Sequence, residues 1–323
     1  MIVGQDRAVD QFATAWASRK LHHAWLLAGP KGVGKASFAH AAARRVLADA
    51  AGAASNLPGV ESEDGHPMVK LVEAGSHPDM RRLERLTNET TGNLARNISV
   101  DQVRGLAELF ELSPAMSPWR VAVIDSVDDL ETSGANALLK MLEEPPANTL
   151  FFLVSHAPGR LLPTIRSRCR RLDCNKLDDD AMTSILARHA PDLGAAERQR
   201  IISMSFGSVG RALAFAELGL AKLEDSALAI LRQGDPTNAR RSELATELGK
   251  KGAADRYAAF LDLAPSLIAR EARALNGAPQ ERALDAYAKA RELAVIAPRV
   301  SLDPAATVFQ LGGILAEVAS LKR

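Results

Sequence analysis

Cysteine is almost absent from this chain of 323 residues, which contains only Cys169 and Cys174. Two cysteines argue against a disulfide framework and against a cysteine-based zinc cluster. Long apolar runs are also absent, which excludes a membrane-spanning helix. The N-terminal letters "MIVGQDRAVDQ" lack the basic-then-apolar plan of a secretory signal. We therefore expect a cytoplasmic protein that does not interact with membranes.

Aromatic residues are scarce, at 4%, whereas apolar residues make up 47% of the chain. That composition is typical of a soluble, largely helical protein, and the length predicts two or three domains. The net charge is only +1, from 40 basic and 39 acidic residues. Proteins that bind nucleic acid unaided usually have a clear basic surplus. If this chain acts on DNA, we expect partner proteins to supply much of the affinity.

Short apolar segments alternate with amphipathic ones through the first half of the sequence. Such alternation predicts a parallel β-sheet covered by helices on both faces. The segment rich in Ala, Gly, Ser and Pro at 50–68 predicts a loop. Strands are predicted at 24–29, 80–86, 120–127, 149–156 and 168–174, and helices at 34–50, 99–113 and 132–144.

After Cys174 the pattern becomes entirely helical. Short helices are predicted over 176–222, and longer amphipathic helices with polar breaks from about residue 225 to the end. We therefore predict three domains, at 1–175, 176–224 and 225–323.

The letters "GPKGVGKAS" follow the first predicted strand and have the spacing of a phosphate-binding loop, G-x4-G-K. In such a loop the glycines allow backbone N–H groups to turn towards phosphate oxygens, and the lysine reaches the terminal phosphates. A chance glycine-rich turn is the alternative. The candidate nucleotide contacts are Gly29, Pro30, Lys31, Gly32, Val33, Gly34, Lys35, Ala36 and Ser37.

The parts that handle magnesium are incomplete. Ala36 stands where a serine or threonine normally holds the metal, and Ser37 lies one residue late, about 100° further around the helix. Asp125 ends the strand "VAVID", where phosphate-loop ATPases keep a metal-directing aspartate. Ser126 replaces the usual catalytic glutamate. Asp125 could also simply end a strand. The loop can bind ATP, but we do not expect hydrolysis.

A basic run, "RSRCRR" at 166–171, follows the fourth predicted strand. Such runs are most often solvated surface. An arginine there could instead reach the nucleotide site of a neighbouring subunit and stabilise charge on the transferred phosphate. The spacing alone does not decide between the two.

The order of "VGQDRAV", "LLAGPKGVGK", "NALLKMLEEPP", "RSRCRRL" and "GSVGRAL" resembles the clamp-loader branch of the AAA+ family, over residues 2–215. The resemblance implies an α/β AAA+ module, a small helical lid and an all-α collar domain. It implies a DNA polymerase III clamp-loader subunit that joins gamma/tau and delta subunits in a ring of five. That ring loads a sliding clamp onto primed DNA.

Within that family, several positions are similar to the stator type of subunit rather than to the ATPase motors. The changes are Ala36, Ser126, the pair Ser155–His156 at the sensor position, and Gly210 where a motor has its lid arginine, although Arg211 is adjacent and could partly substitute. The "SRC" motif is intact, so the resemblance implies that Arg168 serves in trans as a catalytic arginine. An active gamma/tau-like motor and an autonomous DNA-binding module are the alternatives.

Family members commonly carry four cysteines in a zinc-binding insertion, but residues 48–74 contain none. Asp64, His66, His77 and Asp79 could imitate a ligand set, yet their spacing does not suit a compact tetrahedral site. We predict a solvated loop and no zinc.

Overall fold

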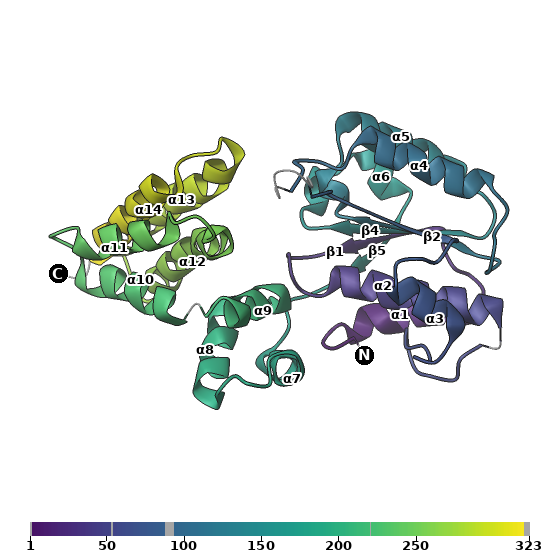
Figure 1. Cartoon of the computed structure of the whole chain (residues 1–323), viewed down its shortest axis with the longest axis horizontal. Helices are drawn as coiled ribbons and strands as arrows, with labels where there is room; N and C mark the ends of the chain where they lie inside the picture. The colour runs from purple at the N-terminus through teal and green to yellow at the C-terminus, as the bar shows by residue number, and fades with distance from the viewer. Residues whose placement is uncertain (1, 53, 88–93, 220, 320–323) are drawn as a thin grey trace. The chain divides into compact units, whose positions relative to one another are not determined.

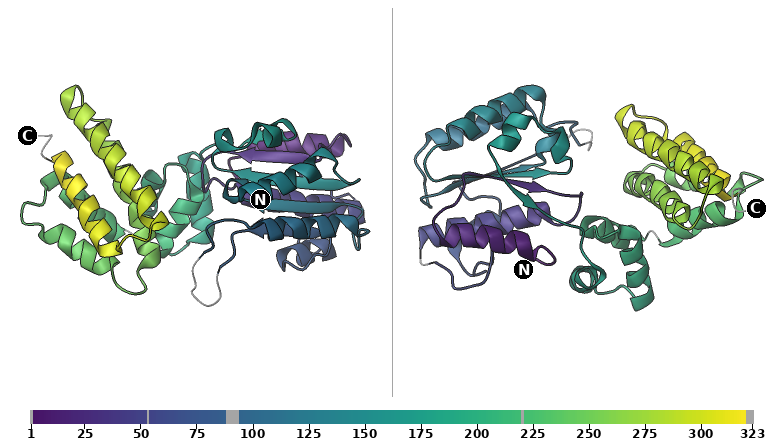
Figure 2. Two further views of the ribbon diagram at one scale, coloured as in Figure 1. Left: turned by 90° about the horizontal axis from the view of Figure 1, so that it is seen from above. Right: turned by 180° about the vertical axis from the view of Figure 1, so that it is seen from behind.

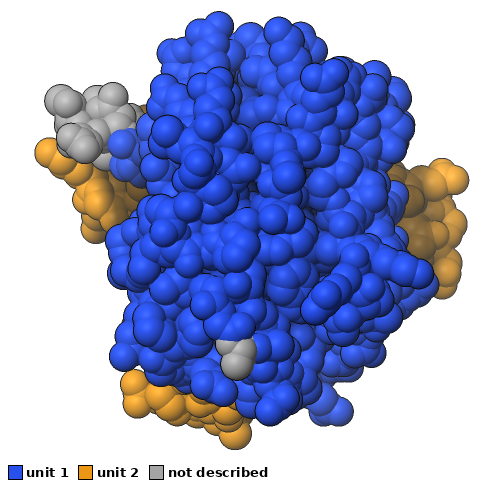
Figure 3. Space-filling model, turned by 90° about the vertical axis from the view of Figure 1, so that its right-hand side faces the viewer, with its two compact units in different colours: residues 1–182, 207–210 blue, residues 183–206, 211–323 orange. Residues whose placement is uncertain are grey.

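The computed structural model describes residues 2–52, 54–87, 94–219 and 221–319 (Figure 1). The chain divides into two compact units, residues 1–182 with 207–210 and residues 183–206 with 211–323 (Figure 3). The segment predicted as a lid, 176–224, contributes to both units, and the predicted boundary at 224 lies inside a helix. The three-domain division stays a prediction, and the last four residues of its third domain lie outside the described residues.

The first unit is built on a five-stranded sheet in the order β2-β3-β4-β1-β5. Every neighbouring pair is parallel, which confirms the predicted parallel sheet. The central strands are buried along their whole length, as expected of a sheet that is covered on both faces. The strands are β1 Ala24–Ala28, β2 Met80–Glu84, β3 Arg120–Asp125, β4 Thr149–Ser155 and β5 Arg170–Asp173.

Helices cover both faces of this sheet (Figures 1 and 2). On one face Phe12, Trp25, Phe38 and Phe152 form a cluster of aromatic rings, with Phe12 at its centre. On the other face α4 and α5 bury Leu106 and Leu138 against strand residues. One layer contains α1 Asp6–Ala17, α2 Lys35–Ala51 and α3 Pro67–Glu73, and the other contains α4 Val100–Glu111, α5 Thr132–Glu143 and α6 Pro163–Ser167.

Local sequence explains where several of these helices begin and end. Ser99 caps α4 in a reciprocal capping box with Gln102, as the sequence predicts for Ser99. Helix α5 ends just before the pair "PP", because proline cannot continue a helix. Helices α1 and α3 were not predicted. Two 3-10 turns, Val127–Asp129 and Pro158–Arg160, connect elements at the carboxyl edge of the sheet.

The second unit is helical. Glu224, only 2% exposed, accepts hydrogen bonds from Arg200 at 2.7 Å and from Arg270 at 3.4 Å, and thereby joins α8, α10 and α12. The helices of the C-terminal half are α7 Asp179–His189, α8 Ala195–Ser205, α9 Val209–Glu217, α10 Ala221–Gln233, α11 Ala239–Leu248, α12 Ala254–Ala272, α13 Ala278–Arg299 and α14 Pro304–Ala319. Among the described residues, no helix has the length and apolar character that crossing a bilayer requires.

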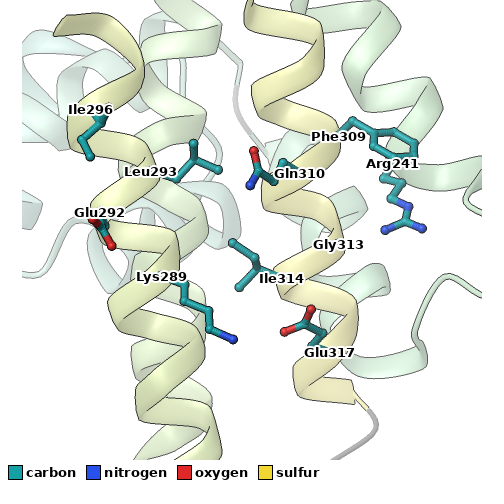
Figure 4. Close-up of a pocket in the computed structure, with 10 residues that line it drawn as sticks. All are labelled: Arg241, Lys289, Glu292, Leu293, Ile296, Phe309, Gln310, Gly313, Ile314 and Glu317. Atoms are coloured by element: carbon teal, nitrogen blue, oxygen red, sulfur yellow. The ribbon is translucent and has the colours of Figure 1, made fainter. Parts of the chain in front are cut away.

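A groove of about 630 Å³ lies between α13 and α14 of the second unit (Figure 4). Its walls include Leu293, Ile296 and Ile314, and its charged groups include Lys289. The Arg241 guanidinium lies over the Phe309 ring, 4.6 Å from its centroid. Ile296 and Phe309 are 40% and 37% exposed, so apolar surface remains open to solvent there.

Candidate functional site

The phosphate-loop segment lies at the carboxyl end of β1, and α2 begins at its lysine. Gly32 and Gly34 have φ angles of +80° and +95°, which favour glycine. A Cβ on Gly29 would lie 2.0 Å from the carbonyl oxygen of Cys174. The glycines are therefore required by backbone conformation and by close approach.

Lys35 is 3% exposed and turned back onto its own loop. Its Nζ donates to the carbonyl oxygen of Gly29 at 2.7 Å and to that of Pro30. Burial lowers the pKa of Lys35, while the negative charges of Asp128 and Asp125 act in the opposite direction. Loop and lysine fit a phosphate group chemically, but Lys35 must release these carbonyl oxygens to contact one.

Gln5, in the motif "VGQDRAV", fixes the base of this loop. Its Nε2 donates to the carbonyl oxygens of Val33 at 3.1 Å and Asn175 at 2.7 Å, and its Oε1 accepts from the Asn175 N–H. Val33 is buried beneath the loop, whereas Lys31 and Ser37 are exposed. The sequence motif alone did not reveal that its glutamine joins the loop to Asn175.

Asp125 ends β3, where the metal-directing aspartate was predicted. Its Oδ2 lies 2.9 Å from Nη2 of Arg82, a β2 residue that sequence reasoning missed. Ser126 is buried and donates weakly to Asp129 at 3.4 Å. With Ala36 offering no hydroxyl, these residues do not fit a magnesium ion. No cluster of possible metal ligands occurs among the described residues.

Asp128 is a second residue that the sequence did not reveal. Its carboxylate accepts from the Ser155 hydroxyl at 2.9 Å and from the backbone N–H of His156 at 2.5 Å and Ala157 at 3.3 Å. Asp128 therefore holds Ser155 and His156, at the end of β4, beside the phosphate loop. The Nδ1 of His156 is buried without a hydrogen-bond partner. Burial and then the charge of Lys35 lower the pKa of His156, so its imidazole is neutral at pH 7.

Arg168 follows α6, and its side chain is 34% exposed. One guanidinium nitrogen donates to the Thr164 carbonyl oxygen at 2.9 Å. Another lies 2.7 Å from Oε1 of Glu143, the last residue of α5. The motifs "MLEEPP" and "SRC" therefore meet through an ion pair.

Two other arginines of the basic run have different contacts. Arg171 pairs with Asp173 at 2.6 Å. Arg170 lies over the Trp25 ring, 5.0 Å from its centroid. Arg168, Arg170 and Arg171 therefore lie in three different environments.

The start of α9 and the residue before it contact the phosphate loop directly. The Ser208 hydroxyl donates to the Lys31 carbonyl oxygen at 3.0 Å, and the Gly210 N–H donates to that of Gly32 at 2.9 Å. Arg211 belongs to the second unit, where its guanidinium lies 3.9 Å from Asp262. Its predicted participation in nucleotide binding stays a prediction.

The insertion between α2 and β2 is not wholly the solvated loop that the sequence predicted, because His77 and Asp79 are only 2% exposed and residues 67–73 form α3. His66 caps α3, the Nε2 of His77 contacts the Met68 sulfur at 3.3 Å, and Asp79 accepts three backbone N–H groups from residues 115–117. The Arg45 guanidinium, 8% exposed, lies at the centre of the insertion's main contacts. It donates to Asp49 and to the carbonyl oxygens of Ser55, Leu57 and Glu61.

A parallel sheet with a phosphate loop after its β1 strand and an aspartate at the end of β3 defines an α/β module of the phosphate-loop type. The family model described as "DNA polymerase III, delta subunit" matches residues 4–178, more than half of the chain. The chain belongs to that family.

Two relatives illustrate the similarity. The chain is 36% identical over 186 residues to DNA polymerase III subunit delta' of Pseudomonas aeruginosa, covering 58% of this chain and 53% of that protein. It is 28% identical over 264 residues to DNA polymerase III subunit tau of Bacillus subtilis, covering 79% of this chain and 44% of the other. The chain thus spans about half the length of these curated relatives.

Among solved structures, a DNA polymerase III gamma subunit-related protein from Thermotoga maritima aligns over 98% of this chain and 100% of its own. The sequence identity is 16% and the TM-score is 0.47.

Proposed function

We propose that this chain is the delta prime, or stator, subunit of a DNA polymerase III clamp loader and helps to load the sliding clamp onto primed DNA. The observation that carries the proposal is the contrast between two sites. The phosphate loop is retained without a fit for magnesium, whereas Arg168 is intact and partly exposed. Family membership and the similarity to a delta' subunit support the same function.

At its own site the chain binds ATP without hydrolysing it. Lys35 and the backbone N–H groups of residues 29–37 contact the phosphates, with Asp125 nearby, and the sequence predicts Arg211 as a further contact. Turnover would need a base to activate water, and the buried hydroxyl of Ser126 cannot serve as a carboxylate base. The chain is therefore a component of the polymerase holoenzyme rather than an ATPase.

The chain contributes to chemistry at the nucleotide site of a neighbouring subunit. Arg168 is offered in trans to ATP bound by an adjacent gamma/tau subunit, where a guanidinium stabilises charge that develops on the transferred phosphate. To make that contact it exchanges Glu143 for the neighbour's phosphate. Both partners of the existing pair are partly exposed, at 34% and 48%, so this exchange is inexpensive.

Assembly occurs through the helical second unit in a cytoplasmic ring of five with gamma/tau and delta subunits. The predicted lid is residues 176–224 and the predicted collar is residues 225–323. Half-exposed apolar groups in the groove between α13 and α14, such as Ile296 and Phe309, suit a neighbouring helix. The balanced net charge of +1 agrees with DNA binding that is shared with the other subunits.

The test is clamp loading onto primed DNA by a loader reconstituted with and without this chain. We expect loading to fall to background when the chain is omitted and to return when it is added back. A Lys35→Ala variant should restore loading as well as the wild type does, because the chain's own site performs no turnover. Undiminished loading without the chain would contradict the proposal.

An active gamma/tau-like motor is the second candidate function. It is favoured by the survival of Gly34, Lys35 and Asp125 and by the similarity to a tau subunit over 264 residues. Its distinguishing property is magnesium-dependent ATP turnover by the isolated chain.

A further inference from the structure

A positively charged side chain of the protein itself, Arg82, lies next to Asp125. In the parallel register of β2 and β3, Glu84 is opposite Asp125. Arg82 lies two residues before Glu84 and therefore on the same face of the sheet. Its Nη2 bridges the two carboxylates, at 2.8 Å from Glu84 and 2.9 Å from Asp125.

This guanidinium reaches the region where α2 begins. Burial and the charges of Arg44 and Arg82 lower the pKa of His40 on α2, and the charge of Asp125 partly offsets the lowering of the Lys35 pKa by burial. Asp125 thus interacts with both cations, with Arg82 through an ion pair and with Lys35 through its charge. Their two positive charges balance the two negative charges of Asp125 and Glu84.

We propose that Arg82 takes the place of magnesium at this nucleotide site, so that magnesium changes neither the affinity of the chain for ADP nor its affinity for ATP. This inference rests on the proposed nucleotide binding. In a phosphate-loop ATPase the positive charge of the metal offsets the repulsion between the acidic residue at the strand end and the negatively charged phosphates. Here Ala36 and Ser126 leave no further ligands for a metal, and Arg82 already neutralises Asp125.

The same contact makes Arg82 a determinant of nucleotide affinity. Without its guanidinium, the Asp125 carboxylate faces the bound phosphates with only Lys35 to compensate for their charge. Arg82 is 47% exposed, so solvent screens part of this effect. Replacing it with glutamine should weaken ADP binding about fivefold in the absence of magnesium.

The experiment is calorimetric titration of the full-length chain with ADP and with ATP, once in EDTA and once in magnesium chloride. We expect the two dissociation constants of the wild type to agree within about twofold for each nucleotide. Arg82→Gln should lose affinity in EDTA. Arg81→Gln is the matched control, because Arg81 lies on the opposite face of the same strand, contacts the Met80 carbonyl oxygen, and should leave affinity unchanged.

The outcomes separate this inference from the one on which it rests. Binding that becomes at least about tenfold tighter with magnesium would overturn the role of Arg82 and leave nucleotide binding itself intact. Equal losses in Arg82→Gln and Arg81→Gln would overturn it too. Absence of binding under both conditions would overturn the nucleotide site and the inference together, while the loading assay would still report on the stator function.

Discussion

Replacing Arg168 by alanine lowers the clamp- and DNA-stimulated ATPase of the reconstituted loader without preventing its assembly. An arginine supplied in trans contributes about 10³ or more to the rate at the site it serves, because it stabilises charge in the transition state. Only the adjacent site depends on this residue, so the total rate falls by that site's share. Steady-state phosphate release, together with size-exclusion chromatography of the complex, provides the measurement.

Two variants control for trivial causes. Arg171→Ala removes a neighbouring exposed arginine that pairs with Asp173 and should leave the rate unchanged. Glu143→Ala removes the partner of Arg168 in the isolated chain and should retain most of the activity, because the contact in trans does not use it. An unchanged rate with Arg168→Ala in an intact complex would identify Arg168 as ordinary surface charge.

We expect that replacing Arg45 by methionine destabilises the insertion between α2 and β2, which contains no cysteine. The guanidinium contacts Asp49, which is itself 3% exposed on its side chain, and three carbonyl oxygens of the loop that follows α2. Breaking a buried ion pair costs about 3–5 kcal/mol. Asp49 would keep the N–H donors of Trp16 and Ser55 but lose its charged partner, and the loop would lose its central donor. We expect a clear fall in the free energy of unfolding, measured by urea denaturation.

The matched control is Arg104→Met. Arg104 also donates to an aspartate on its own helix, Asp101, but the two side chains are 69% and 82% exposed. Exposed pairs contribute about 0–1 kcal/mol, so this variant should remain close to the wild type. If Arg45→Met were as stable as Arg104→Met, the insertion would be held by its apolar contacts alone, such as Val69 and Met68 on α3.

The parts of the fold that the sequence predicted well are those that local pattern determines. The apolar runs of β3 and β4 and the glycine of the loop before α2 need no long-range partner to be recognised. Ser99 predicted the start of α4, because helix capping depends on a local hydrogen bond. The parallel sheet followed from alternation of strands and helices.

The parts that sequence reasoning missed are side-chain contacts between residues far apart in the chain. Arg82 and Asp125 are separated by 43 residues, and Gln5 and Asn175 by 170. Asp128 looked like one of several acids in a turn, and only its bonds to the end of β4 distinguish it. No periodicity or motif spacing records such pairings. They become visible only when strand register brings the ends of the strands together.

The central claim is that the chain supports chemistry at a neighbouring site and performs none at its own. The most direct test is magnesium-dependent ATP turnover by the isolated chain, compared with its Lys35→Ala variant under identical conditions. We expect that neither protein releases phosphate above background. Turnover by the wild type that Lys35→Ala abolishes would instead establish the chain as an active motor.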